Sequence, residues 1–416
     1  MTPEQAERYL LSLELFGMRF GLDRMHRLTT ALGNPQSSFD SIHVVGTNGK
    51  SSTVRMIAAI LERHGLCTGS YLSPHLVSFS ERIRIGDEDL GREAFAAAVT
   101  RAARAAELVD RSLAGEDRVT QFEALTAAAY SELAARHVDV AVVEAGLGGR
   151  YDATNVLPSK VQVLTSVGLE HTRWLGPTIA DIAREKLAVV KDAGTLAVGS
   201  GLHPDAEAEA QAVAAARGAR LVRAGADPGV PVGALGGFQR RNFALAATAA
   251  EAYLGRLDRA AVAAAASDVR VPGRLQITGE KPLTLFDGAH NPEGMAALAE
   301  SLDEIVTGRR LVAVVSILDD KDAAAMLGLL LPACDALVLT SSQNPRALPP
   351  PTLQSLARQL DGPPSELVRA PGAALARARE LAGPDGVVLA TGSIYLVADL
   401  LRLEAGDSRR GRVSRL

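Results

Sequence analysis

Short apolar runs alternate with longer helical patterns along most of the chain. The apolar runs have the length of buried strands, and the Ala-rich stretches between them have the length and spacing of helices. Strands are predicted at 42–45, 138–143, 161–167, 283–286, 311–316, 336–340 and 387–390, and helices at 53–61, 92–109, 119–136 and 178–191. This alternation predicts an α/β fold with doubly wound, largely parallel sheets.

The pattern is interrupted at 271–274, where Val-Pro-Gly-Arg precedes a new series of strands and helices. A chain of 416 residues is long for one core and comfortable for two domains. We therefore predict domains at 1–270 and 271–403. The tail 404–416 carries four arginines and no apolar periodicity, so we predict that it is disordered.

The first apolar run leads into Gly46-Thr47-Asn48-Gly49-Lys50-Ser51-Ser52, a glycine turn followed by a helical pattern. The two glycines let the backbone bend so that its N–H groups converge, and the helix points its positive end at the same place. Lys50 would then contact the β- and γ-phosphates, and Ser51 or Ser52 would place a hydroxyl on Mg²⁺. Because positions 44 and 45 are not glycine, the loop is a shortened variant of the general signature. The alternative is a turn with an exposed lysine.

Two further strand ends carry side chains that bind metals. The strand at 138–143 ends in Glu144 and a glycine-rich turn, and the strand at 161–167 precedes His171. The carboxyl ends of neighbouring parallel strands share one edge of a sheet, so Glu144 is expected beside the phosphate loop, where a Mg²⁺ ligand is needed. A strand-end glutamate that faces water is the alternative. A metal-capable His171 at the same edge favours the metal site.

The segment Ser73-Pro74-His75-Leu76 predicts a short strand end and turn, and the alternation from Arg82 to Ile85 predicts an exposed strand. Polar residues in such loops often contact ligands. By residue type, His75 could be only a turn residue and Arg82 only a solvated cation. The residues alone therefore leave open whether His75 and Arg82 contact a ligand.

Composition narrows the class of protein. Charged residues make up 22% of the chain, the net charge is −4 and both signs are interleaved, so no basic stripe indicates nucleic-acid binding. The two cysteines are far apart and do not form a metal-type pair, which is typical of a reducing compartment. No apolar run approaches the ~18 residues of a membrane span, and the N-terminus does not resemble a secretory signal. We predict a cytoplasmic protein without nucleic-acid or membrane partners.

Several motifs together resemble the folylpolyglutamate synthase and dihydrofolate synthase family of Mur-type ATP-dependent amide ligases. The motifs are 46–50, 73–76, Glu-Ala-Gly-Leu-Gly-Gly-Arg at 144–150, Asp-Gly-Ala-His-Asn at 287–291 and Thr-Gly-Ser at 391–393. The resemblance extends from Phe16-Gly17 to Tyr395-Leu396. It implies a Mg²⁺–ATP site on an N-terminal P-loop domain and a smaller, Rossmann-like C-terminal domain.

The resemblance also implies individual roles. The residues similar to the magnesium ligands are Ser52, Glu144 and His171, and those similar to catalytic residues are Lys50, His171, Lys186 and Arg274. The residues similar to those that contact adenine, γ-phosphate and ribose are Asn242, Arg274, Asp287 and His290. The loop that lies along the pteridine is similar to Ser73, Pro74, His75 and Arg82. By its sequence alone Lys186 is an ordinary helical lysine, but its counterpart in such ligases is carbamylated, which would create a carboxylate for a second Mg²⁺. The implied cofactors are ATP, two Mg²⁺ ions and K⁺. Since the loop has Lys-Ser-Ser where the family usually has Lys-Gly-Ser, the choice between Ser51 and Ser52 stays open.

The reaction that the resemblance implies is ATP-dependent addition of L-glutamate to tetrahydrofolate and to dihydropteroate through an acyl phosphate, by a monomer. An enzyme for only one of these steps is an alternative. A cell-wall Mur ligase is another, although the residues ahead of the phosphate loop are too few for the extra domain that such enzymes carry. A P-loop nucleotide switch would leave the 287–291 turn unexplained.

Overall fold

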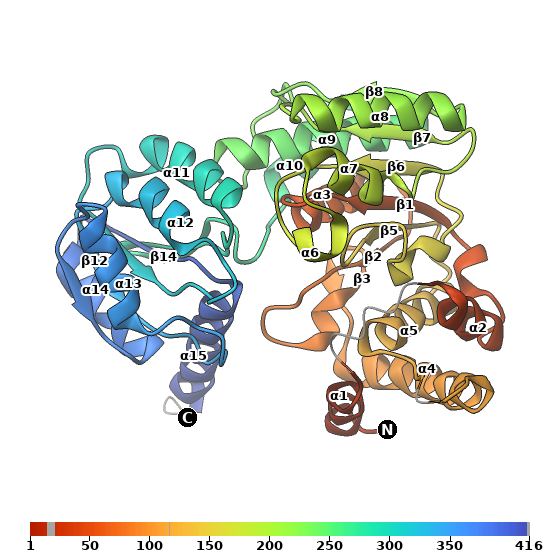
Figure 1. Ribbon diagram of the computed structural model, residues 1–416, viewed down its shortest axis with the longest axis horizontal. Coiled ribbons are helices and arrows are strands. Elements are labelled where there is room, and N and C mark those ends of the chain that lie inside the picture. The colour runs from red at the N-terminus through yellow and green to blue at the C-terminus, as the bar shows by residue number, and fades with distance from the viewer. Residues whose placement is uncertain (15–20, 116, 414–416) are drawn as a thin grey trace. The chain divides into compact units, whose positions relative to one another are not determined.

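The computed structural model describes residues 1–14, 21–115 and 117–413, with side chains described as far as residue 405. Phe16-Gly17, where the family resemblance begins, lies outside these residues. The chain forms two compact units, Met1–Gly233 with Arg241–Val269 and Ala234–Arg240 with Arg270–Leu416. In each unit helices flank a central sheet (Figure 1).

The junction between the units follows Val269, next to the break predicted at 271–274. The segment 234–240, predicted in the first domain, belongs to the second unit instead. Its apolar side chains explain this assignment, because Leu235 and Phe238 pack against the core of the second unit. The backbone N–H of Gly237 also donates to Ser301 Oγ at 3.1 Å.

The first unit contains a sheet with the strand order β4-β3-β2-β5-β1-β6-β7-β8. Its strands are β1 (Asp40–Val45), β2 (Thr68–Tyr71), β3 (Ile83–Ile85), β4 (Glu88–Asp89), β5 (Val140–Glu144), β6 (Val161–Leu164), β7 (Thr195–Val198) and β8 (Arg220–Arg223). β1 pairs in parallel with β5 and β6, whereas β3 and β4 form an antiparallel edge. The loop that follows β1 therefore lies among the carboxyl ends of three parallel strands, where open α/β sheets bind ligands.

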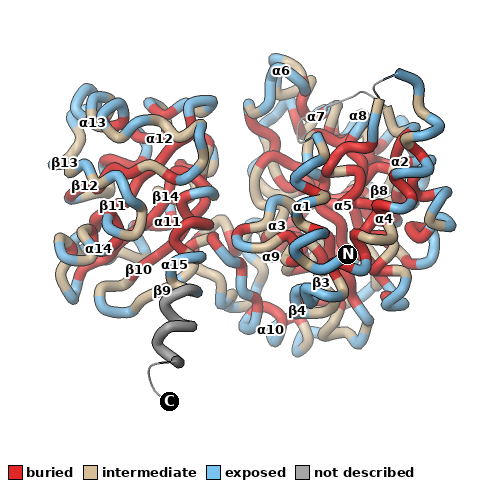
Figure 2. The backbone as a smooth tube through the Cα atoms, turned by 90° about the horizontal axis from the view of Figure 1, so that it is seen from below, coloured by how far each residue is buried: buried red, intermediate tan, exposed pale blue. Residues whose placement is uncertain are grey.

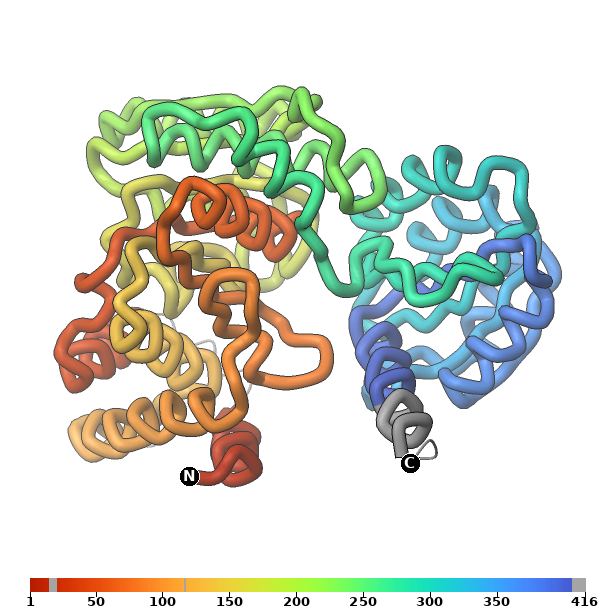
Figure 3. The backbone as a smooth tube through the Cα atoms, turned by 180° about the vertical axis from the view of Figure 1, so that it is seen from behind, coloured from red at the N-terminus to blue at the C-terminus, as the bar shows by residue number. Residues whose placement is uncertain are grey.

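Helices cover both faces of this sheet. They are α1 (Pro3–Ser12), α2 (Asp23–Ala31), α3 (Lys50–Arg63), α4 (Arg92–Ser112), α5 (Gln121–Ala135), α6 (Thr172–Leu175), α7 (Ile179–Leu187), α8 (Pro204–Arg217), α10 (Arg259–Asp268) and the greater part of α9 (Gly237–Leu254). α3 follows β1 and packs against β2, β5 and α10 (Figure 3). α4 and α5 pack against each other and against the opposite face.

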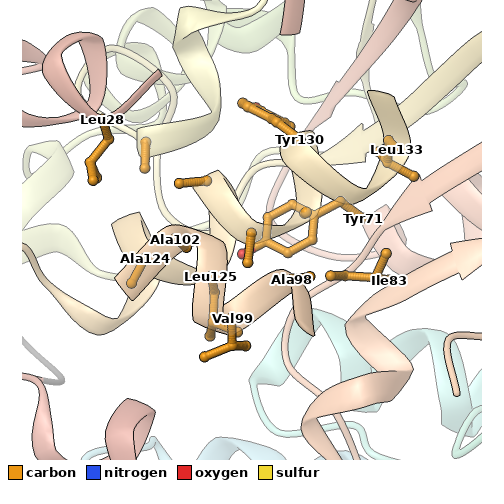
Figure 4. Packing of buried hydrophobic residues seen from close by; sticks show 14 of the residues in the cluster. Leu28, Tyr71, Ile83, Ala98, Val99, Ala102, Ala124, Leu125, Tyr130 and Leu133 are labelled. Carbon is orange, nitrogen blue, oxygen red and sulfur yellow. The ribbon is translucent and has the colours of Figure 1, made fainter. Parts of the chain in front are cut away.

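The core beneath α4 and α5 explains why the predicted helices at 92–109 and 119–136 form. Their alanines allow close packing, and Leu125, Tyr130 and Leu133 are fully buried against the sheet residues Tyr71 and Ile83 (Figure 4). Full burial of each such apolar side chain contributes about 1.5–3 kcal/mol. The same burial colours the central strands of each unit red in Figure 2.

The second unit contains a sheet with the strand order β13-β12-β11-β14-β10-β9, parallel except for β9. Its strands are β9 (Gln276–Glu280), β10 (Leu283–Phe286), β11 (Leu311–Val315), β12 (Ala336–Leu339), β13 (Ser365–Leu367) and β14 (Val387–Thr391), and its helices are α11 (Pro292–Val306), α12 (Ala323–Leu330), α13 (Pro350–Gln359), α14 (Pro371–Ala382) and α15 (Ile394–Val413). This confirms the predicted α/β class with a doubly wound second unit.

Helix α15 continues to Val413, across residues 404–413 for which the sequence predicts disorder. The apolar start of the helix, including Leu396, Val397 and Leu400, is buried. Extending an established helix requires no new nucleation, which accounts for the longer span. No helix in the described part of the chain is long and apolar enough to cross a membrane.

Candidate phosphate and metal site

The turn after β1 has the backbone geometry of a phosphate loop. Gly46 has φ 153° and Gly49 has φ 85°, and the latter value favours glycine. A Cβ at Gly46 would lie 1.8 Å from Thr165 Oγ1, and a Cβ at Gly49 would lie 2.6 Å from Asn242 Oδ1. Only glycine fits at either place. Asn242, predicted at the nucleotide site, is thus beside the loop.

The end of β6 braces this turn. Thr165 Oγ1 donates to Asn48 O at 2.6 Å, Ser166 O accepts the Thr47 N–H at 2.8 Å, and Ser166 Oγ accepts the Asn48 N–H at 2.9 Å. Neither Thr165 nor Ser166 is among the site residues predicted from the sequence. The available signal was their position immediately after a buried strand, at the edge where the loop lies.

The N-terminus of α3 is open to a ligand. Gly49 is its N-cap residue and, among the described residues, no side chain caps the helix, so the N–H groups of the first turn can bind an anion. Lys50 Nζ donates to Gly46 O at 3.1 Å and to Thr47 O at 3.0 Å. These bonds hold the ammonium over the loop, where its positive charge adds to that of the helix end.

Glu144 connects the phosphate loop to the segment after β2. It is 1% exposed; its Oε1 accepts from Ser51 Oγ at 3.0 Å and its Oε2 from the Ser73 N–H at 3.1 Å. Ser51, Ser73 and Glu144 therefore lie together, and Glu144 does not face water. A hydroxyl beside a carboxylate supplies the oxygen ligands that Mg²⁺ prefers. Ser52 is buried at 2% exposure on the same helix, and the bond to Glu144 belongs to Ser51.

His171 lies at the start of α6 with φ 54° and an exposed side chain. Among the described residues no three His, Cys, Asp or Glu side chains form a metal-binding group. The side-chain oxygen atoms that lie together here are instead the Glu144 carboxylate and the Ser51 hydroxyl.

Lys186, which the sequence alone leaves as an ordinary helical lysine, is 4% exposed. Its Nζ donates to Gly46 O at 2.8 Å, so α7 contributes a second cation to the phosphate loop. The turn at 146–150 permits this approach, because a Cβ at Gly149 would lie 2.4 Å from Lys186 O.

The segment 73–82 forms a small polar cluster. Arg82 Nε donates to His75 Nδ1 at 3.0 Å, and the rings of His75 and Phe79 lie 4.3 Å apart. Glu81 accepts the N–H groups of Leu76, Val77 and Ser78 at 2.6–2.9 Å. The predicted His75 and Arg82 thus come together, and the unpredicted Glu81 shapes the loop that carries His75.

A buried hydrogen-bond chain lies behind the loop. His43 on β1 is fully buried, and its Nε2 lies 2.8 Å from Thr154 Oγ1, which in turn donates to Asp152. Asp152 also accepts the Leu147 N–H at 2.8 Å, fixing the glycine-rich turn. Burial, with the charge of Lys191, lowers the pKa of His43 to about 3, and burial raises the pKa of Asp152. The histidine is therefore neutral at physiological pH.

In the second unit, Arg274, Asp287 and His290 gather at the carboxyl end of β10. Asp287 accepts the N–H groups of Leu275 and Ala289 at 2.9 and 2.8 Å. A Cβ at Gly288 would lie 2.3 Å from Arg274 Nη1. Burial raises the pKa of Asp287, while the positive charge of Arg274 opposes that rise.

The fold and these sites define a class. A P-loop unit with a carboxylate on the neighbouring strand precedes a second doubly wound unit, and residues 273–394 match the family described as Mur ligase, glutamate ligase domain. The chain is a Mur-type, ATP-dependent ligase.

Comparison with known proteins narrows the class. The chain is 35% identical over 408 residues to the dihydrofolate synthase/folylpolyglutamate synthase of Mycobacterium tuberculosis, covering 87% of this chain and 84% of that protein. A structure of Escherichia coli FolC in complex with DHPP and ADP is similar with a TM-score of 0.86 and 29% identity, covering 99% of both chains. The chain belongs to the folylpolyglutamate synthase and dihydrofolate synthase family.

A longer relative shows the same likeness over part of its length. The probable bifunctional folylpolyglutamate synthase/dihydropteroate synthase of Haloferax volcanii is 34% identical over 426 residues. This chain is covered to 96% in that comparison but spans only 50% of the relative.

Proposed function

We propose that this protein adds L-glutamate to tetrahydrofolate and to dihydropteroate at the expense of ATP. The observation that carries the proposal is the contact of Ser51 and Ser73 with Glu144 beside an open phosphate loop. The relatives from Mycobacterium tuberculosis, Bacillus subtilis and Escherichia coli are named for both activities.

In this proposal the first turn of α3 and Lys50 bind the phosphates of ATP. Lys50 is placed by the carbonyls of Gly46 and Thr47, so binding requires little rearrangement of the lysine. Asn242, Asp287 and His290 are proposed to contact the adenosine, and Ser73, Pro74, His75 and Arg82 to lie along the acceptor.

The residues around Glu144 fit Mg²⁺. Glu144 and Ser51 provide oxygen atoms, and a buried carboxylate favours a cation beside it. We propose Glu144 with the hydroxyl of Ser51 or Ser52, and His171, as ligands. The ion would neutralise phosphate charge when bound.

The proposed reaction has two steps. A carboxylate oxygen of the acceptor attacks the γ-phosphorus of ATP and ADP leaves, giving an acyl phosphate. The free amine of L-glutamate then attacks the acyl carbon, the amide bond forms, and inorganic phosphate leaves with loss of a proton. Lys50 and Arg274 are proposed to stabilise negative charge on the transferring group, a contribution of several kcal/mol for well-placed donors.

We also propose that Lys186 is carbamylated and that the site binds a second Mg²⁺ and K⁺. Carbamylation of Lys186 is compatible with its bond to Gly46 O, since a carbamate retains one N–H. The second Mg²⁺, K⁺, a monomeric state and a cytoplasmic location rest on the family resemblance and the composition.

Phosphate release from Mg²⁺–ATP and L-glutamate tests the proposal, with dihydropteroate, with tetrahydrofolate and with neither acceptor. The products are checked by mass. Release with both acceptors and a gain of one glutamyl unit is expected. Release with a single acceptor would assign the protein to that step alone, and equal release without any acceptor would contradict a ligase.

A further inference from the structure

Arg55 on α3 has unused hydrogen-bond donors close to the proposed site. Within the described part of the chain its guanidinium makes no hydrogen bond and no ion pair, although the residue is only partly exposed. A guanidinium carries five N–H donors in a fork that matches a carboxylate. Its neighbours on the helix, such as Arg63, are fully engaged in ion pairs. Arg55 is therefore available to a ligand.

The helix places Arg55 toward the acceptor segment. Ser51 and Arg55 are four residues apart and share one helix face, and Ser51 Oγ bonds Glu144 at 3.0 Å. Further along the same side, Glu62 faces the turn between β3 and β4, since a Cβ at Gly86 would lie 2.8 Å from Glu62 Oε1. Arg55 lies between these two points.

The strand register supports the same placement. Arg84 on β3 is the partner of Ser70, and Ser70 is the partner of Val142, which is two residues before Glu144. Because side chains alternate along strands, Arg84 and Glu144 point to one face of the sheet, the face that α3 covers. Arg55 thus faces the sheet between β5 and β3, beneath the segment that begins at Ser73.

The acids near Arg55 are already engaged. Glu81, Asp89 and Glu144 attract the guanidinium electrostatically, and Arg84 repels it. Glu81 accepts three backbone N–H groups, Asp89 pairs with Arg84, and Glu144 accepts from Ser51 and Ser73. Burial lowers the pKa of Arg55 to about 10, so it remains a cation near neutral pH.

We propose that Arg55 binds the non-reacting α-carboxylate of a glutamyl acceptor, and so determines the use of folates over pteroates. This inference rests on the proposed function. The two carboxyl carbons of a glutamyl group are about 5 Å apart when extended. The four-residue step from Ser51 to Arg55 is about 6 Å along the helix. A γ-carboxylate at the phosphate loop would thus place the α-carboxylate near Arg55.

Dihydropteroate has a single carboxylate, which is the group that reacts. It offers Arg55 no second anion, so the residue discriminates between the two acceptors. A purely structural role, in which Arg55 only offsets the charges of Glu81 and Glu144, would affect both acceptors alike.

The experiment compares Arg55→Gln with wild type at saturating Mg²⁺–ATP and L-glutamate. We expect the KM for tetrahydrofolate to rise about 10- to 100-fold, the scale of charge-assisted hydrogen bonds. The KM for dihydropteroate should stay within about twofold. Arg55→Lys keeps the charge but not the forked arrangement of donors, so its KM for tetrahydrofolate should lie between those of wild type and Arg55→Gln. Arg63→Gln on the same helix is the charge-matched control and should change neither KM selectively.

A binding measurement separates this inference from the proposed function. Calorimetric titration with pteroate and with pteroylglutamate should show a selective loss of pteroylglutamate affinity in Arg55→Gln. That loss without turnover in wild type would sustain the inference and contradict the proposed function. Turnover of both acceptors with equal effects of Arg55→Gln, or with none, would overturn the inference and leave the function standing. Wild-type turnover and binding of pteroates alone would also overturn it.

Discussion

Two strand–turn–helix connections, one in each unit, differ in how they satisfy the start of the helix. After β1 the turn 46–49 leads into α3, which no side chain caps in the part of the chain that the structure describes. After β10 the turn 287–291 leads into α11, whose N-terminus is capped by Asn291 through the Gly294 N–H at 2.7 Å. Asp287 binds two more backbone N–H groups around that turn.

The difference shows that one topology serves two purposes. The second turn contains its own carboxylate and cap, so its backbone donors are satisfied by the protein. No described side chain caps the helix after the first turn, so Lys50 and the N–H groups there can bind an anion from a ligand. Strand–turn–helix geometry alone does not therefore make a phosphate site.

Removing the lysine of the open turn tests this contrast most severely. Lys50→Ala should lower kcat about 10³-fold, the scale of losing one preorganised charge that stabilises a transition state. Steady-state phosphate release measures the effect. Lys160→Ala is the control, because that lysine pairs with Asp40 at the amino end of the same sheet. Equal activities of wild type and Lys50→Ala would contradict an anion site at this turn.

Acid should weaken the strand that leads to the open turn. The pKa of His43 is about 3 in the folded protein and about 6.5 in an unfolded chain. Between these values the unfolded state binds the extra proton, so the free energy of unfolding falls as the pH falls, by about 1.4 kcal/mol per pH unit. Above pH ~6.5 His43 makes no pH-dependent contribution.

Urea unfolding from pH 7.5 to pH 4.5 measures that slope. His43→Gln should flatten it, and the exposed His203→Gln should not. An unchanged slope in His43→Gln would show that other groups govern acid stability.

Alanine substitution of one glycine in each turn, Gly49 and Gly288, tests the backbone conformation of that turn. Gly49→Ala forces a left-handed residue against Asn242, and should lower the free energy of unfolding by about 1–2 kcal/mol and weaken ATP binding. Gly288→Ala meets only the flexible end of Arg274, so its loss should be smaller. Thermal unfolding with and without ATP compares the variants. Equal losses of unfolding free energy in the two variants would contradict the proposed difference in backbone conformation between the two turns.

The cap of the second turn should have the smallest effect. Asn291→Ala removes the side-chain acceptor of α11 and should cost about 1 kcal/mol of unfolding free energy. Asn291→Ser should retain most of it, because serine also caps helices. Chemical denaturation measures both variants. A serine variant as unstable as the alanine variant would exclude capping as the cause.

The sequence predicts the central strands of both sheets, the order of the two units and the phosphate loop because these depend on local patterns, whereas it does not predict β4, β7, β8, β9 and β13. Apolar runs of strand length and glycine turns report directly on backbone geometry. The position of Glu144 beside the phosphate loop also follows from the parallel topology, because the carboxyl ends of neighbouring strands share one edge of the sheet. The Ser51 contact, which the sequence leaves open against Ser52, depends on the helix phase of α3.

Other features require the tertiary structure. Lys186 is ordinary in a helical pattern, and only its burial against Gly46 distinguishes it. Arg55 looks like any polar residue of α3, and only the structure shows that its guanidinium has no hydrogen bond or ion pair with another described residue. The assignment of residues 234–240 to the second unit depends on the packing of Phe238 against side chains that are distant in the sequence.

Glu144 also couples two parts of the candidate site. One carboxylate holds a hydroxyl of the phosphate loop with one oxygen and the backbone of the following segment with the other. A ligand that draws Oε1 away from Ser51 changes the hold on Ser73. Thermodynamic reciprocity then requires that occupancy at Ser73 alter affinity at the loop by the same factor. Glu144 thus couples the phosphate loop to the segment that begins at Ser73, and the strength of this coupling is measurable by two titrations.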